Sequence, residues 1–497
     1  MGSITDAVVN RLRKFLRIEP AEEREVVIKD PLTHEGNCAK NRIWYRGLPN
    51  QLSEFYKAIT DSPMFWAAKP TRGLEIRKIH TGLAAIVTDM IVKIICNDFN
   101  GIEIDGDGKE ANKERWDDIA KDNDFEELFG DAVKDCAIVG DGAFKISFDP
   151  EISDNLIIEF YPAERVEFVH RRGRIREVHF YTDIKHDRKF FRFVEEYGYG
   201  GIKYKLLGEN GREVPLDEIP ETAWAKGQNV TFDKSQIWAV PMLYGKSAVF
   251  EGRGKPLLDS KDTAGDALDE SFSQWMDALR AGRTKTYIPE SLIPRDPNTL
   301  VPLKPNAFDN RFIVTGDDMK ENGRNTITPV SPEIRHDSYL ATYITALDVY
   351  LQGVISPSTI GIDVKKLDNA EAQREKEKTT LYTRQNFVEM VQKTLPKLVQ
   401  CVLNADRALR NQPLLSDIEV KAKFGEYANP SFESQVETIG KARTMKVMSI
   451  EQGVEEMYGD SKSDEWKAEE VARIKAEEGI TELPQTYEAD DIDLTEV

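Results

Sequence analysis

Cysteine and histidine are scarce in this sequence, with four and six copies in 497 residues. The cysteines include no CxxC pair, and the histidines include no HExxH motif and no pair at the spacing of metal ligands. Such usage is typical of reduced thiols in a cytoplasmic type of compartment. The sequence therefore predicts no disulfide framework and no metal site.

Long hydrophobic runs are absent as well. The most apolar stretch, LAAIVTDMIVKII, is interrupted by Asp89 and Lys93 and is shorter than the roughly 20 residues that a bilayer requires. The N-terminal segment VVNRLRKFLRIEP is basic and amphipathic but lacks the apolar core of a signal peptide. We therefore expect a protein that is neither secreted nor inserted in a membrane.

Motifs of catalysis and nucleotide binding are also missing. YGKS resembles the end of a phosphate loop, but Val240 stands where that loop needs its first glycine. DGDGKEANKERW has Glu110 and Trp116 where a calcium loop needs glycine and glutamate. YGYGG lacks the third glycine of a dinucleotide fingerprint, and no GxSxG occurs. The sequence predicts neither an enzyme nor a cofactor.

Basic residues are fewer than acidic ones, 67 against 87, so the formal net charge is -20. Phosphate binding requires clustered Lys and Arg, so we do not expect this chain to coat nucleic acid non-specifically. Apolar residues at 40% and charged residues at 31% are typical of a folded chain rather than a disordered one. The length suits about three domains.

Hydrophobic periodicity predicts a mainly helical α+β chain. Helices are expected over 50–98, and alternating strands with turn signals are expected from 143 to about 240. The predicted apolar face of a helix over 76–95 is Ile79, Leu83, Ile86, Val87, Met90 and Ile94. The segment from Ser431 onward is polar and helical and ends in the acidic tail YEADDIDLTEV.

A helix predicted over 255–281, with Gly282 as its stop, has an almost purely acidic polar side. Its acids fall on one arc roughly 100° wide, namely Asp259, Asp262, Asp266, Asp269, Glu270 and Asp277. The arc can be a solvated face, a nuclease-like metal cluster, or a surface that repels phosphate. Repeated around a ring, such a surface would line a channel through which DNA passes without being held.

Prolines punctuate the next stretch, 286–332, and exclude long helices and central strands there. Because helix resumes over 335–355, the pattern predicts a small module mounted on two helices. A segment with the helix-breaking Ser356, Pro357 and Gly361 then leads into a long helix over 370–409.

The sequence resembles the portal (head–tail connector) proteins of tailed double-stranded DNA bacteriophages. The order of elements across the whole chain is similar, and four stretches carry the likeness: NRIWYRGLPNQLSEFY, IHTGLAAIVTDMIVKII, KPLLDSKDTAGDALDESFSQ and GVISPSTIGIDVKKLDNAEAQREKEKTTLYTRQNF. The resemblance implies a fold with wing, stem, clip and crown regions that forms a ring with an axial channel. In this numbering the regions are the wing (1–254 and 379–430), stem helices (255–281 and 335–355), clip (282–334), tunnel loop with the start of the long helix (356–378), and crown with acidic tail (431–497).

The resemblance also implies a function without catalysis. The expected protein is a homo-oligomeric, dodecameric ring at one capsid vertex, which serves DNA packaging and ejection, terminase docking and head–tail joining. Its expected partners are further copies of itself, the large terminase motor, the head–tail adaptor, the major capsid and scaffolding proteins, and double-stranded DNA that passes without tight binding. It would be assembled in the host cytoplasm and reside in the virion.

Under this resemblance, three further groups of residues receive roles beside the acidic arc. The tip of the tunnel loop nearest DNA would be Val364, Lys365, Lys366 and Leu367, with the two lysines as transient phosphate contacts. Docking of partners at the clip would use Arg283, Lys285, Arg295 and Arg311. Pairing between subunits would use Glu371, Arg374, Glu375 and Lys376. Trp466 is expected to pack between neighbouring copies.

Two other functions remain open at this point. A metal-dependent nuclease or other DNA-processing enzyme would use the acids of the 255–281 helix. A scaffold that forms helical bundles with partners would assemble no closed ring.

Overall fold

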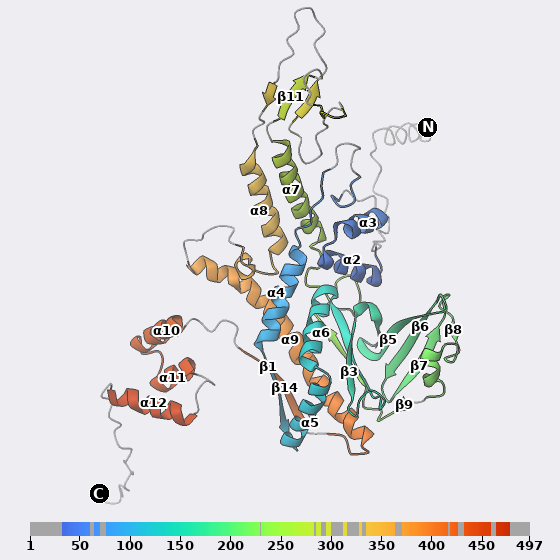
Figure 1. Cartoon of the computed structure of the whole chain (residues 1–497). Helices are drawn as coiled ribbons and strands as arrows, with labels where there is room; N and C mark the ends of the chain where they lie inside the picture. Colours follow the sequence, from blue (N-terminus) through green and yellow to red (C-terminus); the bar gives the residue numbers. More distant parts are fainter. Residues whose placement is uncertain are drawn as a thin grey trace, which may run out of the picture. The chain divides into compact units, whose positions relative to one another are not determined.

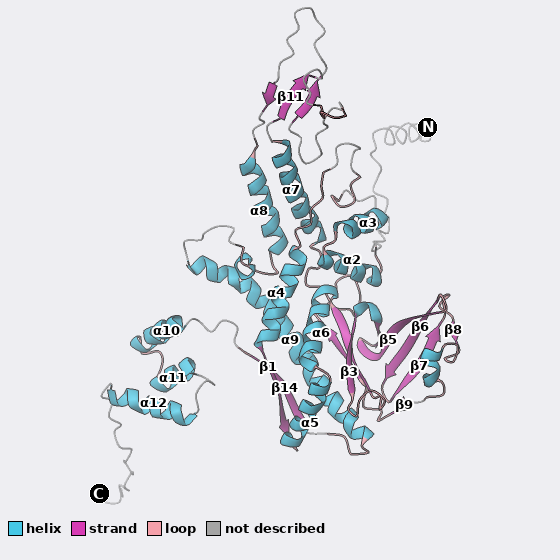
Figure 2. Ribbon diagram, viewed as in Figure 1, coloured by secondary structure: helices cyan, strands magenta, loops and turns pink. Residues whose placement is uncertain are grey.

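The computed structural model (Figures 1 and 2) describes residues 32–59, 64–69, 76–228, 230–282, 285–289, 295–299, 312–315, 328–330, 334–362, 370–415, 418–425, 432–458 and 464–477. The chain divides into two compact units, Met1–Phe424 and Gly425–Val497. Helices and sheets are both abundant, which confirms the predicted α+β class. The ring and its channel are properties of an assembly and stay predictions.

The described helices of the first unit are α2 (His34–Arg46), α3 (Pro49–Ile59), α4 (Leu83–Asp98), α5 (Lys109–Asp122), α6 (Phe125–Val139), α7 (Asp262–Ala281), α8 (His336–Leu351) and α9 (Ala370–Leu409). Its strands are β1 (Phe99–Gly106), β2 (Asp141–Ser147), β3 (Ile157–Pro162), β4 (Val166–Arg171), β5 (Arg174–His186), β6 (Lys189–Gly198), β7 (Gly201–Leu207), β8 (Glu213–Val214), β9 (Val230–Thr231), β10 (Ala239–Leu243), β11 (Lys285–Pro289), β12 (Phe312–Thr315), β13 (Thr328–Val330) and β14 (Ile418–Phe424). Short 3₁₀ helices are Ala163–Arg165, Pro220–Ala225 and Pro357–Ile360.

The core of the first unit is built around α9, which packs against α4, α5, β10 and β14. Its fully buried positions recur every three or four residues, as one face of a helix does: Phe387, Val391, Leu395, Leu398 and Val402. The helix runs from Ala370 to Leu409 and continues through Pro396. The predicted range of this helix is therefore confirmed.

Helix α4 buries a different face from the one predicted over 76–95. The helix begins only at Leu83, and Ile86 is 47% exposed. Residues on the buried line follow one another at every fourth position, namely Leu83, Val87, Ile91 and Ile95. The prediction fails at Ile79 because its backbone N–H donates to Ser273 Oγ on α7 at 2.9 Å, so this segment tethers α7 instead of forming a helix.

The strands predicted from 143 to about 240 are present, and their pairings are antiparallel. One sheet has the order β10-β2-β3 and another has the order β4-β5-β6-β7-β8, with β9 paired to β7. A two-stranded sheet joins β1 to β14. Helix α5 buries the side chain of Trp116.

Helices α7 and α8 lie side by side and lead to the small sheet of β11, β12 and β13 (Figure 1). Helix α7 begins at Asp262 rather than at 255, because residues 256–260 form turns. It ends before Gly282, as predicted. Strand β11 pairs in parallel with β12 and antiparallel with β13. A module of short strands between two helices therefore matches the prediction for this stretch.

The second unit contains α10 (Phe432–Thr444), α11 (Ile450–Tyr458) and α12 (Asp464–Glu477), as the helical prediction for this region requires. The rings of Tyr458 and Trp466 meet edge to face, with centroids 4.9 Å apart. Trp466 thus has a packing partner within its own chain, and packing between copies stays a prediction. The acidic tail lies outside the described residues.

Candidate functional site

The candidate functional site of the first unit is the α7–α8 helix pair. Aromatic rings join the two helices, since Tyr343 of α8 lies 5.7 Å from Phe272 and 6.2 Å from Trp275 between ring centroids. The pair carries the β11 sheet at one end and enters the core at the other, where Leu268 and Leu347 are buried. Its orientation relative to the core depends on how the base of α7 is held.

Asp269 holds the base of α7 through four hydrogen bonds. The carboxylate accepts from Trp66 Nε1 at 3.1 Å, from the backbone N–H of Thr81 at 2.9 Å and from Thr81 Oγ1 at 2.9 Å. His80 Nδ1 lies 2.7 Å from Asp269 Oδ2, the oxygen that also accepts from Trp66. The residue has no exposed surface. A buried carboxylate is tolerated when donors satisfy it in this way.

Asp266 supports the same base one helical turn earlier. It accepts the backbone N–H groups of Phe65 and Trp66 at 2.8 and 3.0 Å. Burial raises the pKa of this carboxyl, and the two N–H donors oppose the rise. Together, Asp266 and Asp269 (here the buried acid pair) fix residues 65–66 and 80–81 to α7.

The prediction that the acidic arc is accessible is therefore wrong for the two residues of the buried acid pair. Both carboxylates are covered within a single chain, at 7% and 0% exposure, and assembly can only cover them further. Hydrogen-bond donors occupy the positions that a cation would need, so the pair does not offer a metal site. No group of His, Cys, Asp and Glu suited to a metal ion occurs in the described part of the chain.

The other four acids of the arc remain partly accessible. Asp262 lies 3.5 Å from Lys40 Nζ, and Asp277 lies 3.9 Å from Arg280. Glu270 accepts from Gln274 Nε2 at 2.8 Å. Asp259 precedes the helix, in the turn before it.

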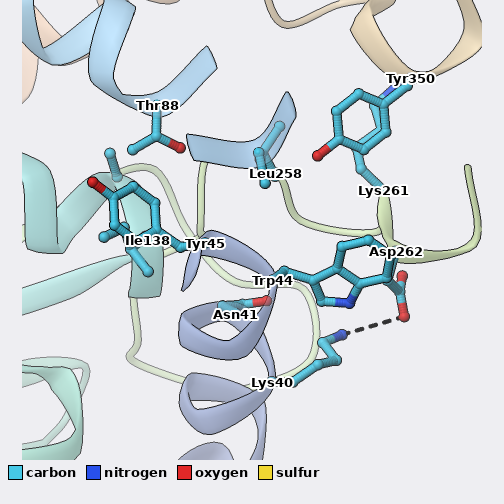
Figure 3. Close-up of a pocket in the computed structure, with 12 residues that line it drawn as sticks. Lys40, Asn41, Trp44, Tyr45, Thr88, Ile138, Leu258, Lys261, Asp262 and Tyr350 are labelled. Carbon is cyan, nitrogen blue, oxygen red and sulfur yellow. Dashed lines mark hydrogen bonds and ion pairs between the residues drawn. The ribbon is translucent and has the colours of Figure 1, made fainter. Parts of the chain in front are cut away.

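A small cavity lies between α2, α4, α6, α7 and α8 (Figure 3). It is lined in part by Trp44, Thr88, Lys261 and Tyr350, and the Lys40–Asp262 ion pair borders it. Its free space of about 30 Å³ suits a water molecule rather than a substrate. Asn41 Nδ2, which has no hydrogen-bond partner among the described residues, is a group that such a water would satisfy.

Half of the remaining predicted site residues fall in parts of the chain that the structure leaves undescribed. These are Val364, Lys365, Lys366, Leu367, Arg283 and Arg311. Only the backbone is described for Lys285 in β11 and for Glu371, Arg374, Glu375 and Lys376 in the first turns of α9. Arg295 is exposed. The assigned roles of these residues stay predictions.

The ends of the predicted tunnel loop are held in the core. The backbone N–H of Ser356 donates to Thr380 Oγ1 at 2.9 Å, and Thr383 Oγ1 donates to the carbonyl of Val354 at 2.6 Å. Gly361, in the left-handed conformation at φ 74°, ends the short 3₁₀ helix before the loop. The segment between is therefore bracketed by fixed points on α9 and after α8.

The sequence analysis missed the bonds that residues 65–66 and 79–81 make with α7. The acids of the pair were recognised, but their partners lie about two hundred positions away in the sequence. No local sequence pattern reports such a contact.

Comparison with known proteins gives no family assignment. No protein-family model and no curated protein matches the chain. The chain is similar to one in the virion of a native gene transfer agent particle, with 12% identity over 82% of this chain and 89% of that one and a TM-score of 0.40. Chains in the neck of the empty and native particles, solved with C6 and C12 symmetry, give 12% identity, coverages of 74% and 87% and of 75% and 89%, and TM-scores of 0.38 and 0.36. Likeness at these TM-scores carries no argument about this chain.

Proposed function

We propose that this chain is the subunit of a portal-type connector, a homo-oligomeric ring that conducts DNA into and out of a capsid at one vertex. The observation that carries the proposal is the α7–α8 pair, which bears a small sheet and is fixed at its base by the buried acid pair. The portal resemblance, which covers the same elements in the same order, supports it.

In such a ring, each copy would contribute one helix pair to the wall of an axial passage. Four hydrogen bonds to Asp269 resist rotation of α7 against the core, so the pairs would keep a common tilt. The partly accessible Asp259, Glu270 and Asp277 would face the passage and repel phosphate. The proposed acidic lining is thus smaller than the arc of six acids.

The segment 363–369 would form the tunnel loop, with Lys365 and Lys366 as brief phosphate contacts. Anchoring of both flanks through Thr380 and Thr383 supports a loop that changes shape while its ends stay fixed. The alternating charges at the start of α9 would then pair with those of the next copy and set the register of the ring.

The sheet at the end of the helix pair would be the docking platform for the terminase motor and later for the head–tail adaptor. Arg283, Lys285, Arg295 and Arg311 would give it basic character. Major capsid and scaffolding proteins would contact the rest of the ring, which would be dodecameric, assembled in the host cytoplasm and retained in the virion. The ring itself would need no cofactor, and DNA would pass without tight binding.

Electron microscopy and native mass measurement of the purified chain test this proposal. A closed ring with an axial opening is the expected result, and a dodecamer is the expected count. A monomer that cleaves DNA in the presence of a divalent metal would overturn it in favour of the nuclease. Helical assemblies with no closed ring would favour the scaffold.

A further inference from the structure

The β4–β5 hairpin concentrates positive charge on a chain whose net charge is -20. Residues 171–176 contain four arginines, all exposed: Arg171, Arg172, Arg174 and Arg176. Within the part of the chain that the structure describes, none of the four forms an ion pair. Some other cations on or beside this sheet are paired, as Arg192 is with Asp183 at 2.7 Å and as Lys226 is with Asp217.

The turn brings the first three of these arginines to one tip. Strands β4 and β5 are joined by Arg172 and Gly173, at φ 53° and 72°, which is the two-residue turn that favours Asn-Gly. Arg171 and Arg174 close the turn as a cross-strand pair. Like charges placed directly opposite each other destabilise a hairpin. The hairpin thus keeps arginines where both the turn and the pairing disfavour them, and nothing in the described chain compensates for it.

The fourth arginine is directed by a bulge to the neighbouring turn. The register shifts between Val169, which faces Glu177, and His170, which faces Ile175, so that Arg176 is the extra residue of a β-bulge. Its guanidinium lies 4.7 Å from the centre of the Tyr199 ring in the β6–β7 turn. A single tyrosine, already covered by an arginine, is a poor platform for stacking nucleic-acid bases.

Acids at this end of the sheet are largely engaged elsewhere. Glu196 pairs with Lys205, and Glu177 lies 3.3 Å from His179 Nε2. Lys203 lines the same groove as Arg176, and Lys234 packs beside the turn at Gly200. This end of the sheet therefore carries more unpaired cations than unpaired acids. The excess is confined to this region, since the net charge of the whole chain is -20.

We propose that this arginine tip (Arg171, Arg172 and Arg174) binds the phosphate backbone of double-stranded DNA, outside any channel. Guanidinium forks match phosphate oxygens in bidentate geometry better than ammonium groups do. A convex tip two strands wide can approach the backbones that border a groove, and such contacts carry no base information. The binding is therefore independent of sequence, confined to the tip and steeply dependent on salt. It requires no ring.

Fluorescence anisotropy of the full chain with a labelled duplex of about 25 base pairs, in about 50 and about 200 mM NaCl, tests the proposal. The test variant combines Arg171→Gln with Arg174→Gln. The matched control combines Arg188→Gln with Lys189→Gln, two exposed cations at the β5–β6 turn, so that it removes the same charge at the opposite end of β5.

We expect the test variant to lose about tenfold or more in affinity at the lower salt and to show a shallower salt dependence, because two phosphate contacts are removed. The control variant should bind within about twofold of the wild type. Equal losses in both variants, or an unchanged test variant, would overturn the proposal. Tighter binding of labelled polyglutamate than of the duplex, lost in the test variant, would overturn it in favour of an acidic protein partner.

The outcome is separate from that of the proposed function. Size-exclusion chromatography in the same buffers records whether the chain forms a ring. If the chain forms a ring but the arginine tip does not bind DNA, only this inference is wrong. If the chain is a monomer that binds DNA through the tip, only the connector proposal is wrong.

Discussion

Asp269 and Asp277 lie on the same helix and carry the same charge, yet their surroundings assign them different work. Asp269 is buried and accepts from Trp66 and Thr81, whereas Asp277 is partly exposed and lies 3.9 Å from Arg280. Burial makes the first a structural group. Only the second type of acid can act on a passing polyanion.

Asp269→Asn should destabilise the fold by about 2–3 kcal/mol, because the new NH₂ group faces N–H donors that the carboxylate satisfied. Asp277→Asn is the matched control and should change stability by less than about 0.5 kcal/mol. Urea unfolding midpoints at an unchanged slope measure both effects. Equal stability of the two variants would show that the bonds to Asp269 do not hold α7.

A partly buried group, His34, makes stability depend on pH. Its Nε2 accepts from Arg253 Nε at 3.1 Å, and Arg253 in turn lies 2.8 Å from Asp141. Burial, followed by the Arg253 charge, lowers the pKa of His34 from 6.5 to about 4. The folded chain therefore holds this ring neutral where the unfolded chain would protonate it.

Because the folded pKa of His34 lies below the unfolded one, its contribution to stability is complete above pH 6.5 and falls as the pH drops towards 4. His34→Gln keeps an acceptor for Arg253 and removes the titration. We expect the difference in unfolding free energy, wild type minus variant, to fall between about pH 7.5 and about pH 4.5. Asp141, whose pKa burial raises to about 6, is present in both proteins and largely cancels. A difference that stays constant with pH would contradict the assignment.

At this scale, the sequence analysis identified residues better than it identified their partners. The six acids of the arc were found by helical periodicity, which relates positions three and four apart. The burial of Asp266 and Asp269 depends on residues 65–66 and 80–81, which come from a distant part of the chain. Pairings of that kind are set by tertiary packing and leave no local pattern in the sequence. Every interpretation of the arc therefore placed its six acids on an accessible surface, whereas two of them are buried in the core.

At the scale of elements, α7 is seated by a glycine. Gly265 faces the rings of Trp44 on α2 and Tyr350 on α8, and a Cβ built there would lie 3.1 Å from ring atoms of both. No side chain longer than a hydrogen fits without movement of these rings. The lack of a side chain at Gly265 therefore allows α7 to pack closely against α2 and α8.

Gly265→Leu should destabilise the protein by about 2–3 kcal/mol or more, because the new side chain overpacks the crossing. Thr263→Leu places the same side chain on the exposed side of the same helix and serves as the control. Thermal and urea unfolding should separate the two variants. If both were as stable as the wild type, α7 would not be seated at Gly265.

Elements were predictable in proportion to how local their signals are. The range of α9 follows from a long apolar period and the breakers before it, and the structure confirms it. The start of α4 was missed because residues 76–82 have a composition that favours a helix. The backbone N–H groups of Ile79 and Thr81 instead donate to side chains of α7. The start of α7 was placed too early for a similar reason, since the turn at 256–260 carries no strong breaker after Pro256.

For the whole molecule, the two units differ in what holds them. The large core cluster is drawn from residues 83–422 and includes none from the second unit. In the described part of the second unit, the buried apolar side chains are those of Ile439 and Val454. Folding of the first unit therefore should not depend on the second.

A chain truncated after Phe424 should fold and unfold at a temperature within a few degrees of the full chain, because it keeps the whole core cluster. Under the connector proposal it should also still form a ring, since the helix pair, the loop flanks and the buried acid pair all lie before the cut. Circular dichroism reports the first expectation, and light scattering coupled to size-exclusion chromatography reports the second. The full chain carrying Asp269→Asn is the informative comparison, because it retains the second unit but loosens the base of α7. If truncation abolished the ring while that variant kept it, assembly would depend on the three helices α10–α12, and the helix pair would lose its assigned role in the ring.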